Sequence, residues 1–203
     1  MKYPLAPKGV FWSLQGEGHL RGFQMCFLRL AGCSVGCVEC DTDYSVASKH
    51  SAEDLATLCD EATPQGALDR WVWITGGEPA DHDLRPLIAA LRAKRFSVAV
   101  ATSGHKRVIP PVDWLSVSPH NPDKVMQVYG SELKLVDGLG GLSLEDCLKR
   151  LPWRGAMYRY VQPLWDVAND CEDDTSLQRC LEFLKAHPDW SLSRQDHKHW
   201  GVA

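Results

Sequence analysis

The chain has 203 residues, of which 44% are hydrophobic and 24% charged, as is typical of globular proteins. This length fits a single domain, residues 1–203, with one core. The formal net charge of -4 gives no electrostatic reason to expect direct binding to nucleic acid. The sequence has no apolar run of about 18 residues and no cationic-then-apolar leader, so we expect neither a membrane span nor a secretory signal.

The predicted elements alternate between strands and helices along the chain. Composition and periodicity predict strands at residues 23–30, 70–75, 96–102, 114–118, 133–136 and 158–161. Capping residues and helical spacing of apolar side chains predict helices at residues 51–62, 81–95, 143–151 and 173–186. Before them, the Gly-Glu-Gly of residues 16–18 predicts a turn between two short strands.

This alternation predicts an α/β fold with a parallel sheet and helical crossovers. Polar motifs follow several of the predicted strands, and ligands of such folds bind at the carboxyl ends of the strands. Because a complete barrel typically takes about 250 residues, we expect an incomplete, partial TIM-type barrel with about six parallel strands and few helices.

A cysteine loop directly follows the strand predicted at residues 23–30. It contains Cys33, Cys37 and Cys40, at spacings of four and three residues. Thiolates suit zinc, copper(I) or iron–sulfur clusters, and a structural zinc site usually takes four protein ligands. Three cysteines on a four-iron cubane would leave one iron open for a small molecule. A zinc site remains an alternative at this point.

Three of the remaining cysteines and one charged residue also carry information. Three cysteines occupy apolar positions of predicted helices, where a free thiol acts as a small hydrophobe: Cys59, Cys147 and Cys180. A reducing, cytoplasmic location is therefore expected. Arg29 interrupts an apolar strand, where an unpaired charge is costly, so it either faces solvent or binds an anion.

Several motifs together resemble a known enzyme family. The Cys-x3-Cys-x2-Cys loop with Gly-Gly-Glu-Pro at 76–79 is similar to the radical S-adenosylmethionine (SAM) superfamily. Gln-Gly-Glu-Gly at 15–18, Thr-Ser-Gly at 102–104, Gln-Pro at 162–163 and Gln-x-His-Lys at 195–198 narrow the resemblance to the 7-carboxy-7-deazaguanine synthase family of queuosine and 7-deazapurine biosynthesis. The resemblance extends over nearly the whole chain.

The resemblance implies a lyase reaction and three cofactors: a [4Fe-4S] cluster, SAM and Mg²⁺. The cluster would cleave SAM to a 5′-deoxyadenosyl radical, which abstracts hydrogen from 6-carboxy-5,6,7,8-tetrahydropterin. The ring contracts and ammonia leaves, giving 7-carboxy-7-deazaguanine. Relatives also imply a homodimer and an external electron donor such as flavodoxin.

The resemblance also assigns residues to ligands. The cluster ligands would be the three loop cysteines, and Thr42 would bind Mg²⁺. Residues expected to contact SAM are Glu39, Cys40, Asp41, Glu78, Gly104, Ser118, Pro119, His120, Gln162, Pro163, Leu164 and Trp165. Residues expected to contact the pterin are Leu14, Gln15, Gly16, Glu17, Arg29, Thr102, Gln195, His197 and the terminal Ala203.

The chain departs from the family pattern at three places, one of which is Arg-Gln-Asp-His-Lys at 194–198, where the common form is Leu-Gln-Thr-His-Lys. His120 stands where many relatives have lysine, which weakens a charge contact to SAM, and the chain ends in alanine rather than proline. Two other functions remain open from sequence: another small radical SAM enzyme such as a glycyl-radical activase, and a zinc-binding scaffold without enzymatic activity.

Overall fold

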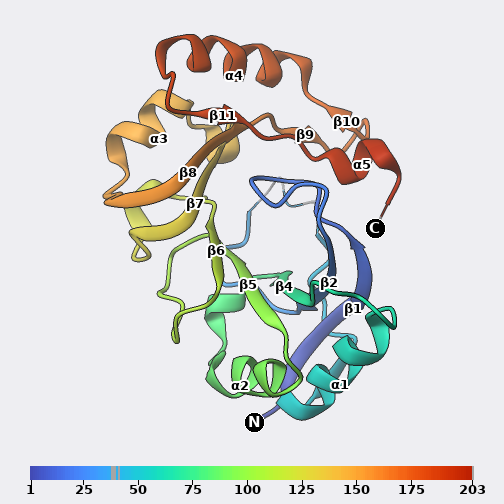
Figure 1. Ribbon diagram of the computed structural model, residues 1–203. Helices are drawn as coiled ribbons and strands as arrows, with labels where there is room; N and C mark the ends of the chain where they lie inside the picture. The colour runs from blue at the N-terminus through green and yellow to red at the C-terminus, as the bar shows by residue number, and fades with distance from the viewer. Residues whose placement is uncertain (38–39, 41, 203) are drawn as a thin grey trace.

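The structure is a computed structural model that describes residues 1–37, 40 and 42–202. Among these residues, nine strands form one sheet in the order β11-β8-β7-β6-β5-β4-β2-β1-β3 (Figure 1). All neighbouring pairs from β2 to β11 are parallel, whereas β1 pairs antiparallel with both β2 and β3. Because β11 and β3 are different edge strands, the sheet is open.

The strands of this sheet are β1 (Tyr3–Leu14), β2 (Gln24–Leu30), β3 (Ser48–His50), β4 (Trp71–Gly76), β5 (Ser97–Thr102), β6 (Trp114–Val117), β7 (Tyr129–Val136), β8 (Gly155–Gln162) and β11 (Ser191–Leu192). A separate pair is formed by β9 (Trp165–Asp166) and β10 (Cys171–Glu172). The helices are α1 (Ala52–Ala62), α2 (Arg85–Ala93), α3 (Leu144–Arg150), α4 (Asp174–Ala186) and α5 (Asp196–Trp200). Short 3-10 turns are η1 (Pro79–Asp81), η2 (Pro122–Lys124) and η3 (Leu139–Gly141).

The α/β fold, the mostly parallel sheet and the small number of helices agree with the prediction. The predicted helix at 81–95 is shorter and begins at Arg85, because residues 79–81 form η1 and the Asp83 carboxylate accepts a hydrogen bond from the Arg85 N–H. The largest difference is β1, a 12-residue strand whose register shifts between Leu5 and Val10. Its prolines hide the strand in the sequence, since proline is normally confined to strand edges and bulges.

Alternating side chains of the strands supply two different faces. Cys26 and Leu28 of β2 pack into the core under α1 and α2, whereas Met25 and Phe27 belong to a cluster on the opposite face. This follows from the two-residue period of a strand. Arg29 comes two residues after Phe27 and therefore lies on the same face of the sheet. Both residues line the candidate site, which is on this face.

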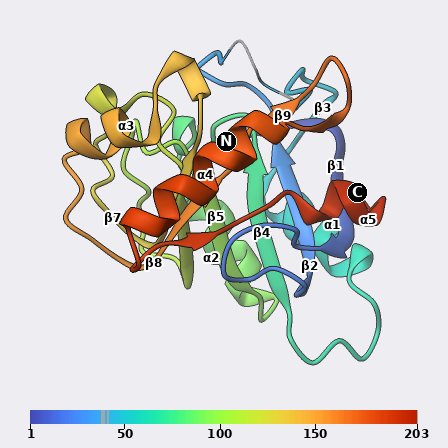
Figure 2. The same ribbon diagram turned by 90° about the horizontal axis from the view of Figure 1, so that it is seen from above.

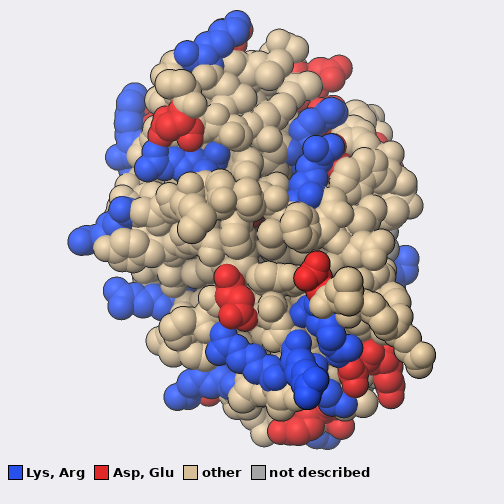
Figure 3. Space-filling view, in the orientation of Figure 1, with Lys and Arg blue, Asp and Glu red and all other residues tan. Residues whose placement is uncertain are grey.

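A second core lies under α3 and α4, where it covers β7 and β8. Figure 1 places α4 at the opposite end of the molecule from α1 and α2, and in the view from above in Figure 2 α4 crosses in front of the strands. On the face shown in Figure 3, acidic and basic side chains are interspersed rather than gathered by sign. No helix within the described part of the chain is long and apolar enough to cross a membrane.

Candidate active site

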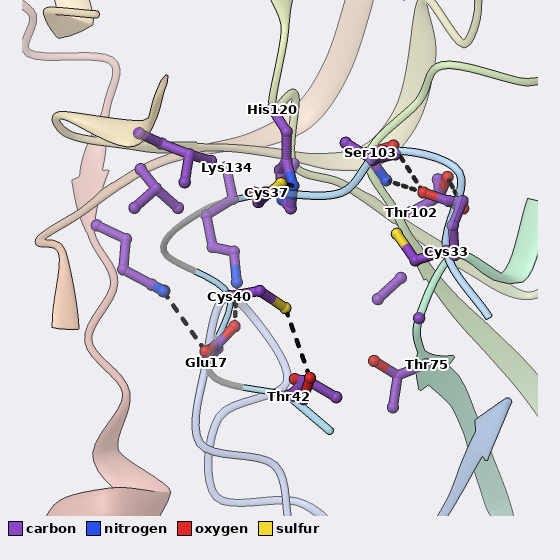
Figure 4. Close-up of a pocket in the computed structure, with 18 of the residues that line it drawn as sticks. Glu17, Cys33, Cys37, Cys40, Thr42, Thr75, Thr102, Ser103, His120 and Lys134 are labelled. Atoms are coloured by element: carbon purple, nitrogen blue, oxygen red, sulfur yellow. Dashed lines mark hydrogen bonds and ion pairs between the residues drawn. The ribbon is translucent and has the colours of Figure 1, made fainter. Parts of the chain in front are cut away.

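The three loop cysteines line one cavity at the carboxyl ends of the parallel strands. This cavity has a volume of about 240 Å³, and Glu78, Ser118 and Gln162 line it from the ends of other strands. In Figure 4, Cys33 lies near Thr102 and Ser103, Cys37 faces His120, and Cys40 points toward Thr42. Residues that follow β4 and β6, and the last residue of β8, therefore line the same cavity as the loop after β2.

The contacts of the thiols differ. The Cys37 Sγ lies 2.9 Å from His120 Nδ1, and the Cys40 Sγ donates to the Thr42 carbonyl oxygen at 3.7 Å. The pKa of His120 is lower than its usual value, mainly because the side chain is buried. Within residues 1–37, 40 and 42–202, no group of three His, Cys, Asp or Glu side chains is gathered closely enough to hold a single metal ion.

Glu78 lies at the end of β4 and is buried, with 2% of its surface exposed. One carboxylate oxygen accepts hydrogen bonds from Thr102 Oγ1 at 2.7 Å and from the Ala80 N–H at 2.9 Å. The other accepts from the Ser103 N–H at 2.8 Å and from Ser103 Oγ at 2.6 Å. All four lone-pair positions of this buried carboxylate are thus used, which fixes its orientation at the cavity wall.

Most described residues that the resemblance assigns to SAM line this cavity. These are Cys40, Glu78, Ser118, His120, Gln162, Pro163, Leu164 and Trp165. Pro119 and Gly104 are not among the lining residues. Gly104 instead has a φ of 77°, and its carbonyl oxygen accepts from the N–H groups of Met126 and Gln127. Glu39 and Asp41 lie outside the described residues.

A second cavity of about 340 Å³ adjoins the first. Its lining includes all of the described residues assigned to the pterin except Thr102: Leu14, Gln15, Gly16, Glu17, Arg29, Gln195 and His197. Thr102 lines the first cavity and donates to Glu78. Thr42 and Lys134 line both cavities, so each has access to both spaces.

The Glu17 carboxylate holds together three segments that are distant in sequence. It forms an ion pair with Lys134 of β7 and accepts from Gln195 Nε2 at 3.0 Å and, more weakly, from Gln162 Nε2 at 3.4 Å. Burial acts to raise the pKa of Glu17 and is the largest single influence. The nearby Lys134, His197 and the hydrogen bonds together outweigh it and lower the pKa to about 2. Glu17 is therefore ionised at neutral pH.

Arg29 lies at the wall of the second cavity, with its guanidinium carbon 5.0 Å from the centre of the Phe11 ring. The C-terminal helix α5 brings His197, which lines the same cavity, against Gly16. A Cβ at Gly16 would lie 2.3 Å from His197 Nδ1, so only glycine permits this close approach. The N-terminal and C-terminal motifs therefore meet at one wall, while Ala203 lies outside the described residues.

The sequence analysis assigned no role to two site residues, Lys134 and Ser103, although Ser103 belongs to the Thr-Ser-Gly motif. Lys134 was detectable, because it interrupts the apolar run of β7 just as Arg29 interrupts β2, and a buried charge requires a partner. Ser103 carries no charge that would require a partner. Its role depends on the carboxylate of Glu78, which belongs to the neighbouring strand end.

The donor set fits an iron–sulfur cluster. Three thiols face one cavity, as thiolate ligation requires, and the backbone beside them is closely packed. A Cβ at Gly77 would lie 1.9 Å from the Gly32 carbonyl oxygen, so Gly77 allows the strand end and the cysteine loop to touch. A parallel sheet with a Cys-x3-Cys-x2-Cys loop beside Gly-Gly-Glu-Pro defines a radical SAM enzyme.

Comparisons with known proteins identify the family within this class. The 7-carboxy-7-deazaguanine synthase of Caulobacter vibrioides is 35% identical over 212 residues, covering 96% of this chain and 97% of that protein. The enzyme of the same name from Escherichia coli K12 is 32% identical over the full length of both chains. The crystal structure of QueE from Escherichia coli matches with a TM-score of 0.69 and 28% identity, covering 96% of this chain and 94% of that one. No protein-family model matches. The chain belongs to the 7-carboxy-7-deazaguanine synthase family.

Proposed function

We propose that the protein is a carbon–nitrogen lyase that converts 6-carboxy-5,6,7,8-tetrahydropterin to 7-carboxy-7-deazaguanine and ammonia. The observation that carries this proposal is the pair of adjoining cavities, one lined by the three cysteines and the other by Arg29, with Thr42 and Lys134 lining both. Such an arrangement would bring a radical source next to an anionic substrate. Membership of the family supplies the identity of the substrate.

Cys33, Cys37 and Cys40 would hold the [4Fe-4S] cluster, and SAM would occupy the rest of the first cavity. When bound, these two groups supply the one-electron chemistry that starts the reaction. The buried carboxylate of Glu78 would attract the ammonium group of SAM through its charge, because its lone pairs are already used by protein donors. Cavity walls built by residues 162–165 would surround the nucleoside and exclude water.

In the second cavity, the Arg29 guanidinium would bind the substrate carboxylate, for which its planar geometry is suited. Gln15, Glu17 and the His197 segment would contact the amino-pyrimidine edge. The Thr42 hydroxyl would give Mg²⁺ one hard oxygen ligand, and substrate and water would complete its shell. Thr42 lines both cavities, so a metal ion bound to its hydroxyl would also reach the substrate.

We further propose that the open sheet is an incomplete TIM-type barrel within one domain. The strands β4, β5, β6, β7 and β8 are neighbours in their chain order, as in such barrels. A homodimer, an external reductant such as flavodoxin and a cytoplasmic location remain part of the proposal. The location is supported by the eight cysteines of the chain, which are free in the structure.

The test is an anaerobic turnover assay with reconstituted protein, SAM, dithionite and the carboxy-tetrahydropterin, followed by chromatography of the products. Deazaguanine formation is expected, and Cys37→Ala should abolish both the cluster and SAM cleavage. Cys180→Ala is the matched control, because Cys180 lies in the α4 core and away from the cavity. Deoxyadenosine without deazaguanine in the wild type would favour another radical SAM enzyme such as an activase. Colourless protein that contains zinc would favour the scaffold.

A further inference from the structure

A hydrogen-bonded network behind the wall of the first cavity connects the cysteine loop to the Gly-Gly-Glu-Pro turn, and its members Ser34, Asp81 and His105 line neither cavity. Its centre is Asp81, the last residue of η1, whose side chain is 15% exposed. The Asp81 carboxylate accepts from the Ser34 N–H at 2.8 Å and from Ser34 Oγ at 2.8 Å. Ser34 directly follows the first cysteine of the loop, so Asp81 holds the chain beside Cys33.

The other side of Cys33 is held by the same turn. The Gly32 carbonyl oxygen accepts a hydrogen bond from the Glu78 N–H at 3.0 Å, and the Gly32 N–H donates to the Tyr44 carbonyl oxygen at 2.9 Å. Cys33 therefore lies between two residues whose positions are fixed from residues 78–81. Two contacts that flank one ligand restrict the direction of its side chain more than either contact alone.

The network also joins Asp81 to the Glu78 carboxylate. His105 Nε2 lies 2.8 Å from Ser34 Oγ and 3.3 Å from Asp81, and its Nδ1 lies 2.9 Å from Ser103 Oγ. Ser103 Oγ in turn donates to Glu78 at 2.6 Å. This Ser-His-Asp order does not make a nucleophile, because the buried Ser103 hydroxyl already donates its proton to a carboxylate.

Lys106 completes the surroundings of Asp81 with an ion pair of 2.6 Å. Charged hydrogen bonds of this kind are stronger than neutral ones and are geometrically specific. An amide in place of the carboxylate would lose the ion pair and one of the two contacts to Ser34, while its size would be unchanged.

We propose that Asp81 is a positioning residue for the cluster: through Ser34 it fixes Cys33 toward the cavity, and through His105 and Ser103 it couples the loop to Glu78. The proposal rests on the proposed function, since it requires that the loop hold a cluster. It adds a residue that touches neither cluster nor substrate and that lies outside the motifs described above.

The test compares Asp81→Asn with Asp83→Asn in anaerobically reconstituted protein without pterin. Asp83 is a suitable control because it lies two residues away and its carboxylate pairs with exposed Arg85. We measure the rate of iron release to a chelator and the electron paramagnetic resonance signal of the reduced cluster with and without SAM. Asp81→Asn should release iron about tenfold faster or more, as expected for the loss of a charged hydrogen bond, and should show a changed signal with SAM. The control should match the wild type.

Ser34→Ala and the double variant separate positioning from a general loss of stability. Ser34→Ala removes the hydroxyl contact to Asp81 and keeps the backbone N–H contact. If Asp81 acts through Ser34, the double variant should release iron less fast than the product of the two single effects, because both substitutions weaken the same link. Multiplied effects in the double variant, or wild-type release from Asp81→Asn, would overturn the proposal. Wild-type protein that holds no iron would instead overturn the proposed function.

Discussion

The ion pair between Glu17 and Lys134 is the most informative target for a stability measurement. Both side chains are mostly buried, with 21% and 10% of their surfaces exposed. In Glu17→Gln the negative charge is removed while the size of the side chain is kept. The ammonium group of Lys134 then remains in a site that no longer contains this carboxylate.

The magnitude follows from the pKa of Glu17, which the fold lowers from 4.5 to about 2. A shift of this size corresponds to about 3 kcal/mol of the free energy of unfolding at neutral pH. Because the folded pKa lies below the unfolded value, this stabilisation is complete above pH 4.5 and is lost as the pH falls toward 2. It should decrease to about half near pH 3.

The assay measures urea unfolding of the wild type and of Glu17→Gln, both without cofactors. Unfolding is monitored by circular dichroism at several pH values. The variant should be less stable by about 3 kcal/mol at pH 7, and the difference should shrink on acidification. Asp123→Asn is the control, because the Asp123–Arg150 pair is exposed and such pairs contribute less than about 1 kcal/mol.

A second variant tests the cause. Replacing Lys134 by methionine in the Glu17→Gln background removes the unpaired ammonium and should restore part of the lost stability. The reasoning is refuted if Glu17→Gln unfolds within about 0.5 kcal/mol of wild type at pH 7, the range of ordinary surface substitutions. It is also refuted if the difference between the two proteins does not depend on pH.

Two further predictions concern the cluster side of the site. Thr42→Ala should weaken the magnesium dependence of turnover and leave the iron content unchanged; superimposable magnesium titrations would show that Thr42 is not a ligand. Gly77→Ala should cost about 1–3 kcal/mol by overpacking and reduce iron content, because its Cβ would meet the Gly32 carbonyl oxygen. Gly155→Ala is the control, since its Cβ would lie at an ordinary 3.7 Å from Tyr129, and equal iron content in both variants would contradict the packing argument.

Local chemistry made much of the fold and site predictable. The apolar and β-branched composition of β2 and its neighbours predicts strands, and their alternation with helices predicts a parallel sheet. Capping signals such as Ser51 and Asp173 mark helix starts that the structure reproduces. The spacing of the three cysteines predicts a metal-binding loop without knowledge of its surroundings. Each of these features depends on residues that are close together in the chain, so it can be recognised from the sequence alone.

The partners of buried charges were decided by tertiary structure. Glu17 and Lys134 are 117 residues apart, and Asp81 reaches Ser34 across 47 residues. Side chains so far apart meet only after the sheet has set the order of its strands. The full extent of β1 also became evident only through its pairing with β2 and β3.

The sequence by itself therefore determined the kind of chemistry: three thiols in one loop, a glycine-rich turn and a cation in an apolar strand. Tertiary structure decided which of these groups share a cavity and which residues hold them in place. The physical reason is that ligand type depends on the residues themselves, whereas orientation depends on contacts between distant segments. The link from Asp81 to Cys33 through Ser34 is an example of such a contact.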